Sequence, residues 1–62
     1  MNKIEDLRKQ KGGMTQTELA KELDVSQAAI SKWEENQLCI YGLNLIKLSK
    51  YFEVSVDELL GL

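Results

Sequence analysis

The amino-acid sequence predicts an all-α fold, a compact bundle of five short helices in a single domain over residues 1–62. Apolar residues recur every three or four positions, and no β-type alternation lasts long enough to form a strand. The chain contains no proline. Capping boxes, in which a cap side chain and a glutamate three residues later bond each other's backbone N–H, mark three helix starts. These pairs are Asn2 with Glu5, Thr15 with Glu18, and Ser55 with Glu58.

The first two helices are expected over residues 2–11 and 15–23. Gly12 and Gly13 end the first of them, because glycine readily adopts the left-handed backbone found after a helix. The residues expected to face inward are Ile4, Leu7 and Gln10 in the first helix, and Leu19, Ala20 and Leu23 in the second.

The other three helices are expected over residues 26–35, 43–52 and 56–61. Ser26 is the expected N-cap of the third helix, since a serine hydroxyl satisfies a free backbone N–H there. The residues expected to face inward are Ala29, Ile30 and Trp33 in the third helix, Leu45, Leu48 and Phe52 with Ile46 beside them in the fourth, and Val56, Leu59 and Leu60 in the last.

Composition excludes most enzyme chemistry. The chain has no histidine and one cysteine, Cys39, so it lacks both a zinc-ligand set and the side chains of a nucleophilic triad. Gly12-Gly13 lacks the spacing of a phosphate-binding loop. We therefore expect no enzyme activity, no metal and no cofactor. A lone cysteine suits a reducing compartment, and no long apolar segment or signal-peptide pattern is present, so we expect a cytoplasmic protein with no membrane partner.

The charge distribution limits where an anionic partner would bind. The formal net charge is −2, which argues mildly against a nucleic-acid partner. Residues 1–33 hold six bases and five acids, giving +1, whereas residues 34–62 hold two bases and five acids, giving −3. An anionic partner should therefore meet the first half of the chain, or an edge of it.

The link between the second and third helices, Leu23-Asp24-Val25-Ser26, is too short for an antiparallel hairpin. The two helices should therefore cross steeply, as in a helix-turn-helix. The residues that carry this motif are Gln16, Leu19, Ala20, Leu23, Val25, Ser26, Gln27, Ile30, Ser31, Trp33 and Glu34. With them the chain resembles the phage-repressor and Cro-like helix-turn-helix family, from Ile4 to Leu60.

The resemblance implies a sequence-specific protein that binds double-stranded DNA, acting as a transcriptional repressor. It further implies a homodimer on a roughly palindromic operator, with half-sites about one helical turn (~34 Å) apart. In this family the third helix, here residues 26–35, docks in the major groove. An alternative is a protein-interaction module, adaptor-like or antitoxin-like, that keeps the same fold.

The expected DNA contacts lie on the face of the third helix opposite Ile30 and Trp33. They are Gln27, Ala28, Ser31 and Lys32. A glutamine side chain pairs with the N6 and N7 edge of adenine, and an alanine methyl contacts a thymine methyl. Lys32 would reach guanine or a phosphate. The alternative is an ordinary solvent-exposed polar face that binds nothing.

Further contacts are expected at helix ends. Gln16 and Thr17 stand in the first turn of the second helix, where free amides and the helix dipole favour a phosphate. By resemblance, Gln16 also braces Gln27. Asn36 is expected to end the third helix in the left-handed conformation and to offer its amide to DNA. Asn44, near the start of the fourth helix, is expected to offer its amide to DNA in the same way.

Three positions depart from the family pattern. Asp24 stands where the family commonly has glycine, at a turn position expected to need positive φ. One extra residue lengthens the connection at Gly12-Gly13. The segment 37–42 replaces a loop that is often basic and carries proline, so some phosphate contacts are expected to be missing.

Two further features are expected to have a structural role, an ion pair and an apolar run, and the apolar run has binding alternatives as well. By resemblance, Arg8 and Glu34 form a partly buried ion pair between the first and third helices. The apolar run Leu38-Cys39-Ile40-Tyr41 either folds back through Leu38 and Ile40, or contacts a second subunit, or binds a partner protein through Leu38, Ile40 and Tyr41. The resemblance also places dimer contacts near Leu59, Leu60 and Leu62.

Overall fold

The computed structural model describes residues 3–62 and confirms the all-α class. Its helices are α1 (Lys3–Gln10), α2 (Gln16–Leu23), α3 (Gln27–Glu35), the short 3₁₀ turn η1 (Gln37–Cys39), α4 (Gly42–Phe52) and α5 (Val56–Leu60). Over these residues no strand forms, and no helix combines the length and apolar character needed to cross a membrane. The five predicted α-helices are therefore present, and η1 is an addition that the sequence pattern did not predict.

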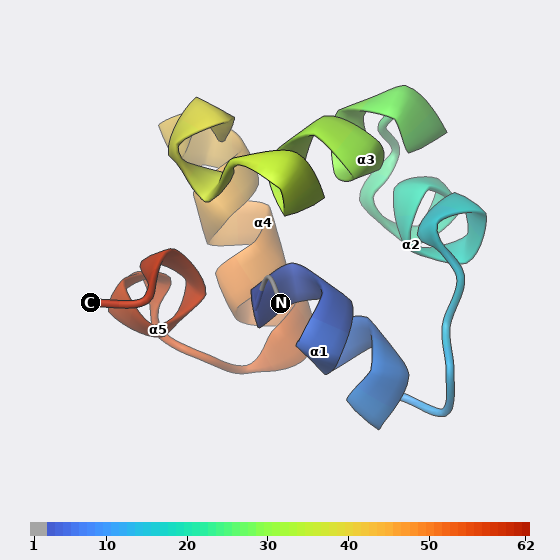
Figure 1. Cartoon of the computed structure of the whole chain (residues 1–62), viewed down its shortest axis with the longest axis horizontal. Helices are drawn as coiled ribbons and strands as arrows, with labels where there is room; N and C mark the ends of the chain where they lie inside the picture. Colours follow the sequence, from blue (N-terminus) through green and yellow to red (C-terminus); the bar gives the residue numbers. More distant parts are fainter. Residues whose placement is uncertain (1–2) are drawn as a thin grey trace.

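The helices divide into two groups around a shared core (Figure 1). In that view α2 and α3 lie on one side, and η1, α4 and α5 lie on the other, with α1 below them. The α2–α3 pair makes the most extensive contact between elements, and α1 packs on both α3 and α5. The helix-turn-helix is thus held by α1 from beneath and by η1 at α3, and its remaining surface faces outward.

Side-chain caps explain where the helices begin. The Thr15 hydroxyl accepts a hydrogen bond from the Glu18 backbone N–H at 3.1 Å, and the Thr15 N–H donates to the Glu18 carboxylate at 2.9 Å. At Ser55 the hydroxyl accepts from the Glu58 N–H, which is one half of the predicted box. The Asn2–Glu5 box lies outside the described residues. Because the cap residues themselves are not helical, α2, α3 and α5 each begin one residue after the cap.

The turn between α2 and α3 contains the left-handed residue that the sequence predicts. Asp24 has φ 58° and ψ 48°, a conformation that aspartate tolerates better than most residues. The reversal lets the Val25 N–H reach back to the Ala20 carbonyl at 2.9 Å. Glu53 ends α4 in the same way, with φ 56°, and no sequence signal distinguished that position.

The core agrees closely with the predicted apolar faces, except at Ile46, which is exposed. Its buried members are Ile4, Leu7, Leu19, Ala20, Leu23, Ile30, Trp33, Ile40, Leu48, Phe52 and Leu59. The expectation for Gln10 is wrong, because this residue is exposed as the last of α1. Gly12 and Gly13 then turn the chain with positive φ, and Met14 packs against the core instead. Leu59 is fully buried, so it supplies no surface for a dimer contact.

The segment after α3 requires two corrections. Asn36 is extended rather than left-handed, with φ −154° and ψ 102°, because its side-chain oxygen caps η1 by accepting from the Leu38 N–H at 3.0 Å. Of the two residues expected to fold back, Ile40 is buried at 7% exposure, whereas Leu38 is 80% exposed. Tyr41 is 81% exposed. The turn of η1 directs only one of these three side chains into the core.

Candidate nucleic-acid interface

The outer face of α3 carries no bulky apolar side chain. Ser26 begins the helix by accepting a hydrogen bond from the Ala29 N–H at 3.1 Å. Ile30 and Trp33 hold the inner face in the core. The expected contact residues lie on the remaining surface: Gln27, Ala28 and Lys32 are exposed, and Ser31 is half-buried. This face can therefore approach another molecule closely along the helix axis.

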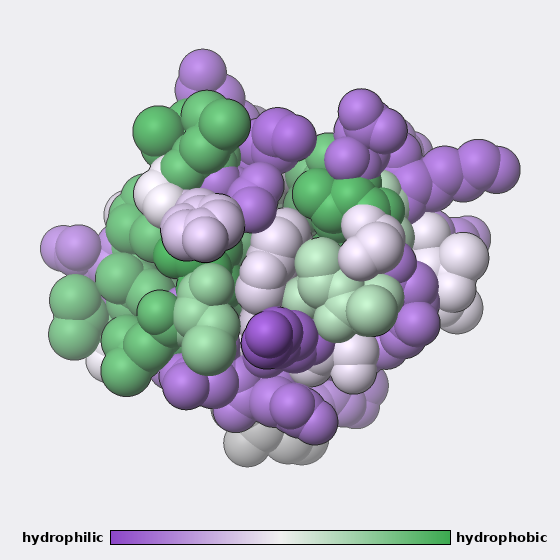
Figure 2. Space-filling model, turned by 90° about the horizontal axis from the view of Figure 1, so that it is seen from above, coloured by the Kyte–Doolittle hydropathy of each residue, from purple (hydrophilic) through white to green (hydrophobic). Residues whose placement is uncertain are grey.

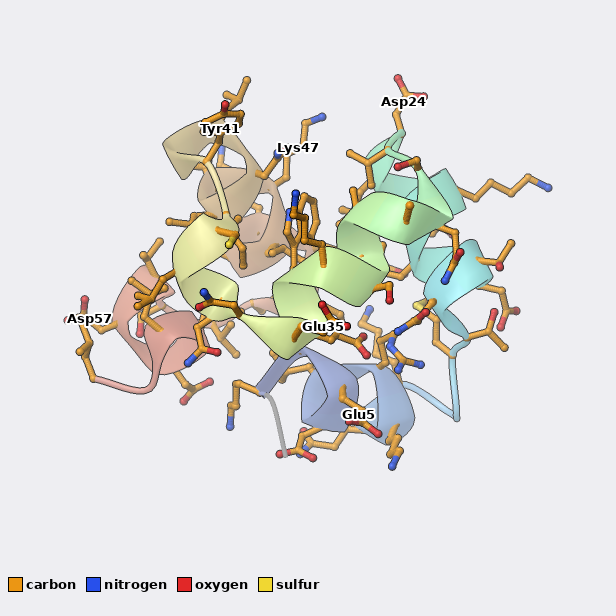
Figure 3. All side chains as sticks on the ribbon, turned by 45° about the horizontal axis from the view of Figure 1, so that its top comes forward. Glu5, Asp24, Glu35, Tyr41, Lys47 and Asp57 are labelled. Atoms are coloured by element: carbon orange, nitrogen blue, oxygen red, sulfur yellow. The ribbon has the colours of Figure 1, made fainter. Side chains whose placement is uncertain are left out.

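The charge of α3 from Gln27 to Trp33 suits an anionic partner, although the helix ends with Glu34 and Glu35. No acidic residue occurs from Val25 to Trp33, and Lys32 is the single base in that stretch. The nearest acids in sequence are Asp24, whose side chain points outward from the preceding turn in Figure 3, and Glu34. The electrostatic cost of bringing phosphates to this face is accordingly small, despite the net charge of the chain.

The first residues of α2 and α3 are joined directly. The Gln27 Nε2 donates to the Gln16 Oε1 at 2.6 Å, which is the bracing contact that the resemblance implies. Gln16 is half-buried, and its own Nε2 donates to the Glu34 carboxylate at 2.9 Å. Thr17 is exposed in the same turn of α2. The two helix starts thus form one polar edge with defined side-chain orientations.

The expected ion pair between Arg8 and Glu34 is present beneath this edge. The Arg8 Nε lies 2.6 Å from one Glu34 oxygen, and Nη2 lies 3.0 Å from the other. Both side chains are nearly buried, at 12% and 10% exposure. The hydrogen bonds to Glu34 raise the pKa of Arg8 above its ordinary value. A third bond, from Nη1 to the Met14 carbonyl at 2.7 Å, ties α1 to the connection before α2.

A groove beside α3 brings together two of the expected contact residues that are far apart in the sequence. Lys32 and Asn44 both line it. Its other lining residues are Val25, Ala29, Trp33, Cys39 and Tyr41. Tyr41 projects from the body of the molecule at this edge (Figure 3). Asn36, by contrast, lies at the far end of α3 from Gln27 with its side-chain oxygen engaged on η1.

Polar and apolar surfaces are segregated around this site. Figure 2 shows the largest gathering of apolar side chains on the side of η1, α4 and α5, and a mixture of polar, small and apolar ones over α2 and α3. The large apolar residues that are exposed are Leu38, Tyr41, Leu43, Ile46 and Leu62. Within residues 3–62 no group of three or more histidine, cysteine, aspartate or glutamate side chains is arranged to hold a metal ion.

Sequence reasoning missed two contacts that support the site. Lys47 on α4 donates to the Leu23 carbonyl at 3.3 Å and so fastens the end of α2. Glu34 accepts from both Arg8 and Gln16, which joins two contacts that the sequence treats as separate. These partners are 18 to 26 residues apart, and no local spacing rule predicts a contact over that separation.

Comparison with known proteins agrees with this geometry. The sequence model of a protein family described as Helix-turn-helix matches residues 4–59. The chain is 45% identical over 59 residues to the HTH-type transcriptional activator BcrR of Enterococcus faecalis, a match that covers 95% of this chain. The same match spans 28% of that protein's length. No solved structure matches the chain significantly.

Proposed function

The chain belongs to the helix-turn-helix family, and from this premise we propose that it is a sequence-specific, double-stranded DNA-binding transcription regulator without enzyme activity. One observation carries the proposal most directly. The Gln16–Gln27 hydrogen bond fixes the leading side chain of an exposed helix that carries no acidic residue from Gln27 to Trp33. A helix of this kind fits the major groove.

In the proposed complex, α3 lies in the major groove with its N-terminal residues at the base edges. Gln27 reads adenine, and Ala28 contacts a thymine methyl. Ser31 and Lys32 act one turn further along. Phosphates are held by Gln16 and Thr17 at the start of α2, where the helix dipole is favourable, and by the amides of Asn36 and Asn44. Lys32 and Asn44 line one groove, so both can contact the same DNA strand.

We further propose a homodimer that represses transcription from a palindromic operator with half-sites ~34 Å apart. The exposed apolar residues Leu38, Leu43 and Ile46, on η1 and α4, provide surface for a second copy. The relative is named as an activator, so whether this chain represses or activates transcription needs its own test. Repression needs only occupancy of the operator, whereas activation needs a further contact with the transcription machinery. A reporter gene downstream of a selected site should decide between them.

The direct test begins with selection of bound sites from random DNA. We expect Gln27→Ala to cost about 1–3 kcal/mol of specific binding and to relax the preference at one base position. Gln10→Ala is the matched control, because Gln10 is exposed at the end of α1, away from α3. Base preferences that are the same in both variants would contradict the placement of Gln27.

The exposed side chains of Leu38 and Tyr41 favour a second candidate, a protein-interaction module. The −3 charge of residues 34–62 also favours it. This candidate predicts no enrichment of any DNA sequence in the selection experiment. It also predicts that Gln27→Ala leaves partner binding unchanged while Tyr41→Ser abolishes it.

A further inference from the structure

Four polar side chains from three helices form one continuous chain of hydrogen bonds. Arg8 on α1 donates to Glu34 on α3. Gln16 on α2 donates to the same carboxylate at 2.9 Å, and Gln27 donates to the Gln16 oxygen at 2.6 Å. We call this set, Arg8–Glu34–Gln16–Gln27, the amide relay. It starts at a nearly buried ion pair and ends at an exposed side chain on the proposed reading face.

The carboxylate determines the direction of every bond in the relay. An ionised carboxylate only accepts hydrogen bonds, whereas a glutamine amide has a donor end and an acceptor end. Gln16 must therefore turn its Nε2 toward Glu34, which leaves its Oε1 facing α3. Gln27 must in turn present an N–H to that oxygen. The orientation of the Gln27 amide follows from a charge two side chains away.

This orientation limits what Gln27 can recognise. Its Nε2 has two hydrogens, and one of them is used on Gln16. One N–H donor and one oxygen acceptor remain for a base. Adenine offers an acceptor at N7 and a donor at N6, which matches this pair, whereas guanine offers acceptors at both N7 and O6. The relay therefore suits adenine and disfavours guanine.

We propose that Glu34 is a specificity-determining residue that sets the adenine preference of Gln27 through Gln16. Glu34 is a positioning residue and does not itself contact DNA. The inference rests on the proposed function, since it concerns how a DNA sequence is read. The two hydrogen bonds from Arg8 hold the Glu34 carboxylate in place, so the relay is set before DNA binds.

Glu34→Gln should reverse the relay. The shorter of the two Arg8–Glu34 bonds, from Nε at 2.6 Å, retains an oxygen at that position. The new amide nitrogen then replaces the other oxygen, gives up the 3.0 Å bond from Nη2 and faces Gln16. Gln16 and then Gln27 turn over, and Gln27 presents both of its N–H groups. We expect its preference for adenine over guanine to fall by roughly 5- to 100-fold, which is the range a bidentate contact provides.

Two further variants isolate this effect. Gln16→Met interrupts the relay but leaves the Arg8–Glu34 pair intact, so it reports on the relay even if Glu34→Gln folds poorly. Glu35→Gln removes the same charge from the next residue, which is exposed, and is the matched control. The affinity ratio for adenine over guanine is measured at the position that Gln27→Ala identifies.

A measurement without DNA separates the relay from the proposed function. In NMR spectra of the ¹⁵N-labelled full chain, one Gln27 side-chain N–H proton should show the chemical shift and temperature coefficient of a hydrogen-bonded proton. We expect this signature in the parent and in Glu35→Gln. The signature should be lost in Glu34→Gln and Gln16→Met.

If it persists in both relay variants, or if the base ratio is unchanged in both, the inference is overturned. If the signature behaves as expected but the parent selects no DNA sequence, the proposed function fails, and the specificity role fails with it.

Discussion

Arg8 shows how much one side chain contributes in so small a core. Its guanidinium makes three hydrogen bonds, two to Glu34 and one to the Met14 carbonyl. These contacts join α1 to α3 and to the connection before α2. A nearly buried charge that loses its partner is left poorly solvated, which costs more than the pair itself contributes.

We therefore expect Arg8→Ala to lower the stability by about 2–3 kcal/mol, somewhat less than for a fully buried pair. The measurement is thermal or urea unfolding followed by circular dichroism. Lys9→Ala is the control, because its pair with Glu5 is exposed and spaced i, i+4, and such pairs contribute about 0.3–0.5 kcal/mol. Equal losses in the two variants would contradict the role assigned to Arg8.

Lys32 has a different role, because it is exposed and contributes little to the core. If it holds a phosphate, Lys32→Ala should weaken binding to all sequences and reduce the slope of log affinity against log salt by about one. Binding is measured across a salt series, with the exposed Lys50→Ala on α4 as the comparison. An unchanged slope and affinity would remove Lys32 from the interface.

At the scale of elements, the start of α2 is stabilised by a charge. The hydrogen bond from the Thr15 backbone N–H lowers the pKa of Glu18, and the Thr15 side chain adds to the effect. The folded state therefore favours the ionised form of Glu18. Its contribution to stability is present above the ordinary value of 4.5 and is lost as the pH falls through the lower folded value.

Glu18→Gln tests this sign, because glutamine keeps an acceptor for the capping box but carries no charge. We expect the parent to melt at a higher temperature than Glu18→Gln at pH 7, and the difference to shrink as the pH falls below 4.5 and through the lower folded pKa. Glu22→Gln removes a charge from the same helix, beyond its first turn. The assignment is wrong if both variants show the same pH dependence.

At the scale of the whole molecule, the segment 38–41 separates folding from assembly. Ile40 is a core residue, whereas Tyr41 beside it is exposed together with Leu38, Leu43 and Ile46. A domain of this size buries little surface by itself. The exposed patch is therefore the natural place for the proposed second copy, and Ile40 is not.

Single serine substitutions should distinguish these roles. We expect Ile40→Ser to cost about 2–4 kcal/mol of stability, with a melting temperature that does not depend on protein concentration. Tyr41→Ser should leave the monomer stable but lower the sedimentation mass and weaken binding to a two-half-site operator. Binding to one half-site should be kept. An unchanged mass and an unchanged operator affinity would exclude Tyr41 from the dimer contact.

The sequence by itself determined the features that depend on near neighbours in the chain. The Thr15–Glu18 cap and the inward faces of Ile30 and Trp33 follow from spacings of one to four residues, whereas the left-handed Asp24 was implied by the family resemblance. Local backbone sterics and helical periodicity decide such features. They were sufficient for the fold class and for the outer face of α3.

Tertiary structure decided the features in which distant residues compete. Ile40 enters the core and Leu38 does not, because η1 directs them differently. Glu34 accepts hydrogen bonds from residues 18 and 26 positions away. Such choices depend on which groups the packed helices bring together, and no local pattern encodes that.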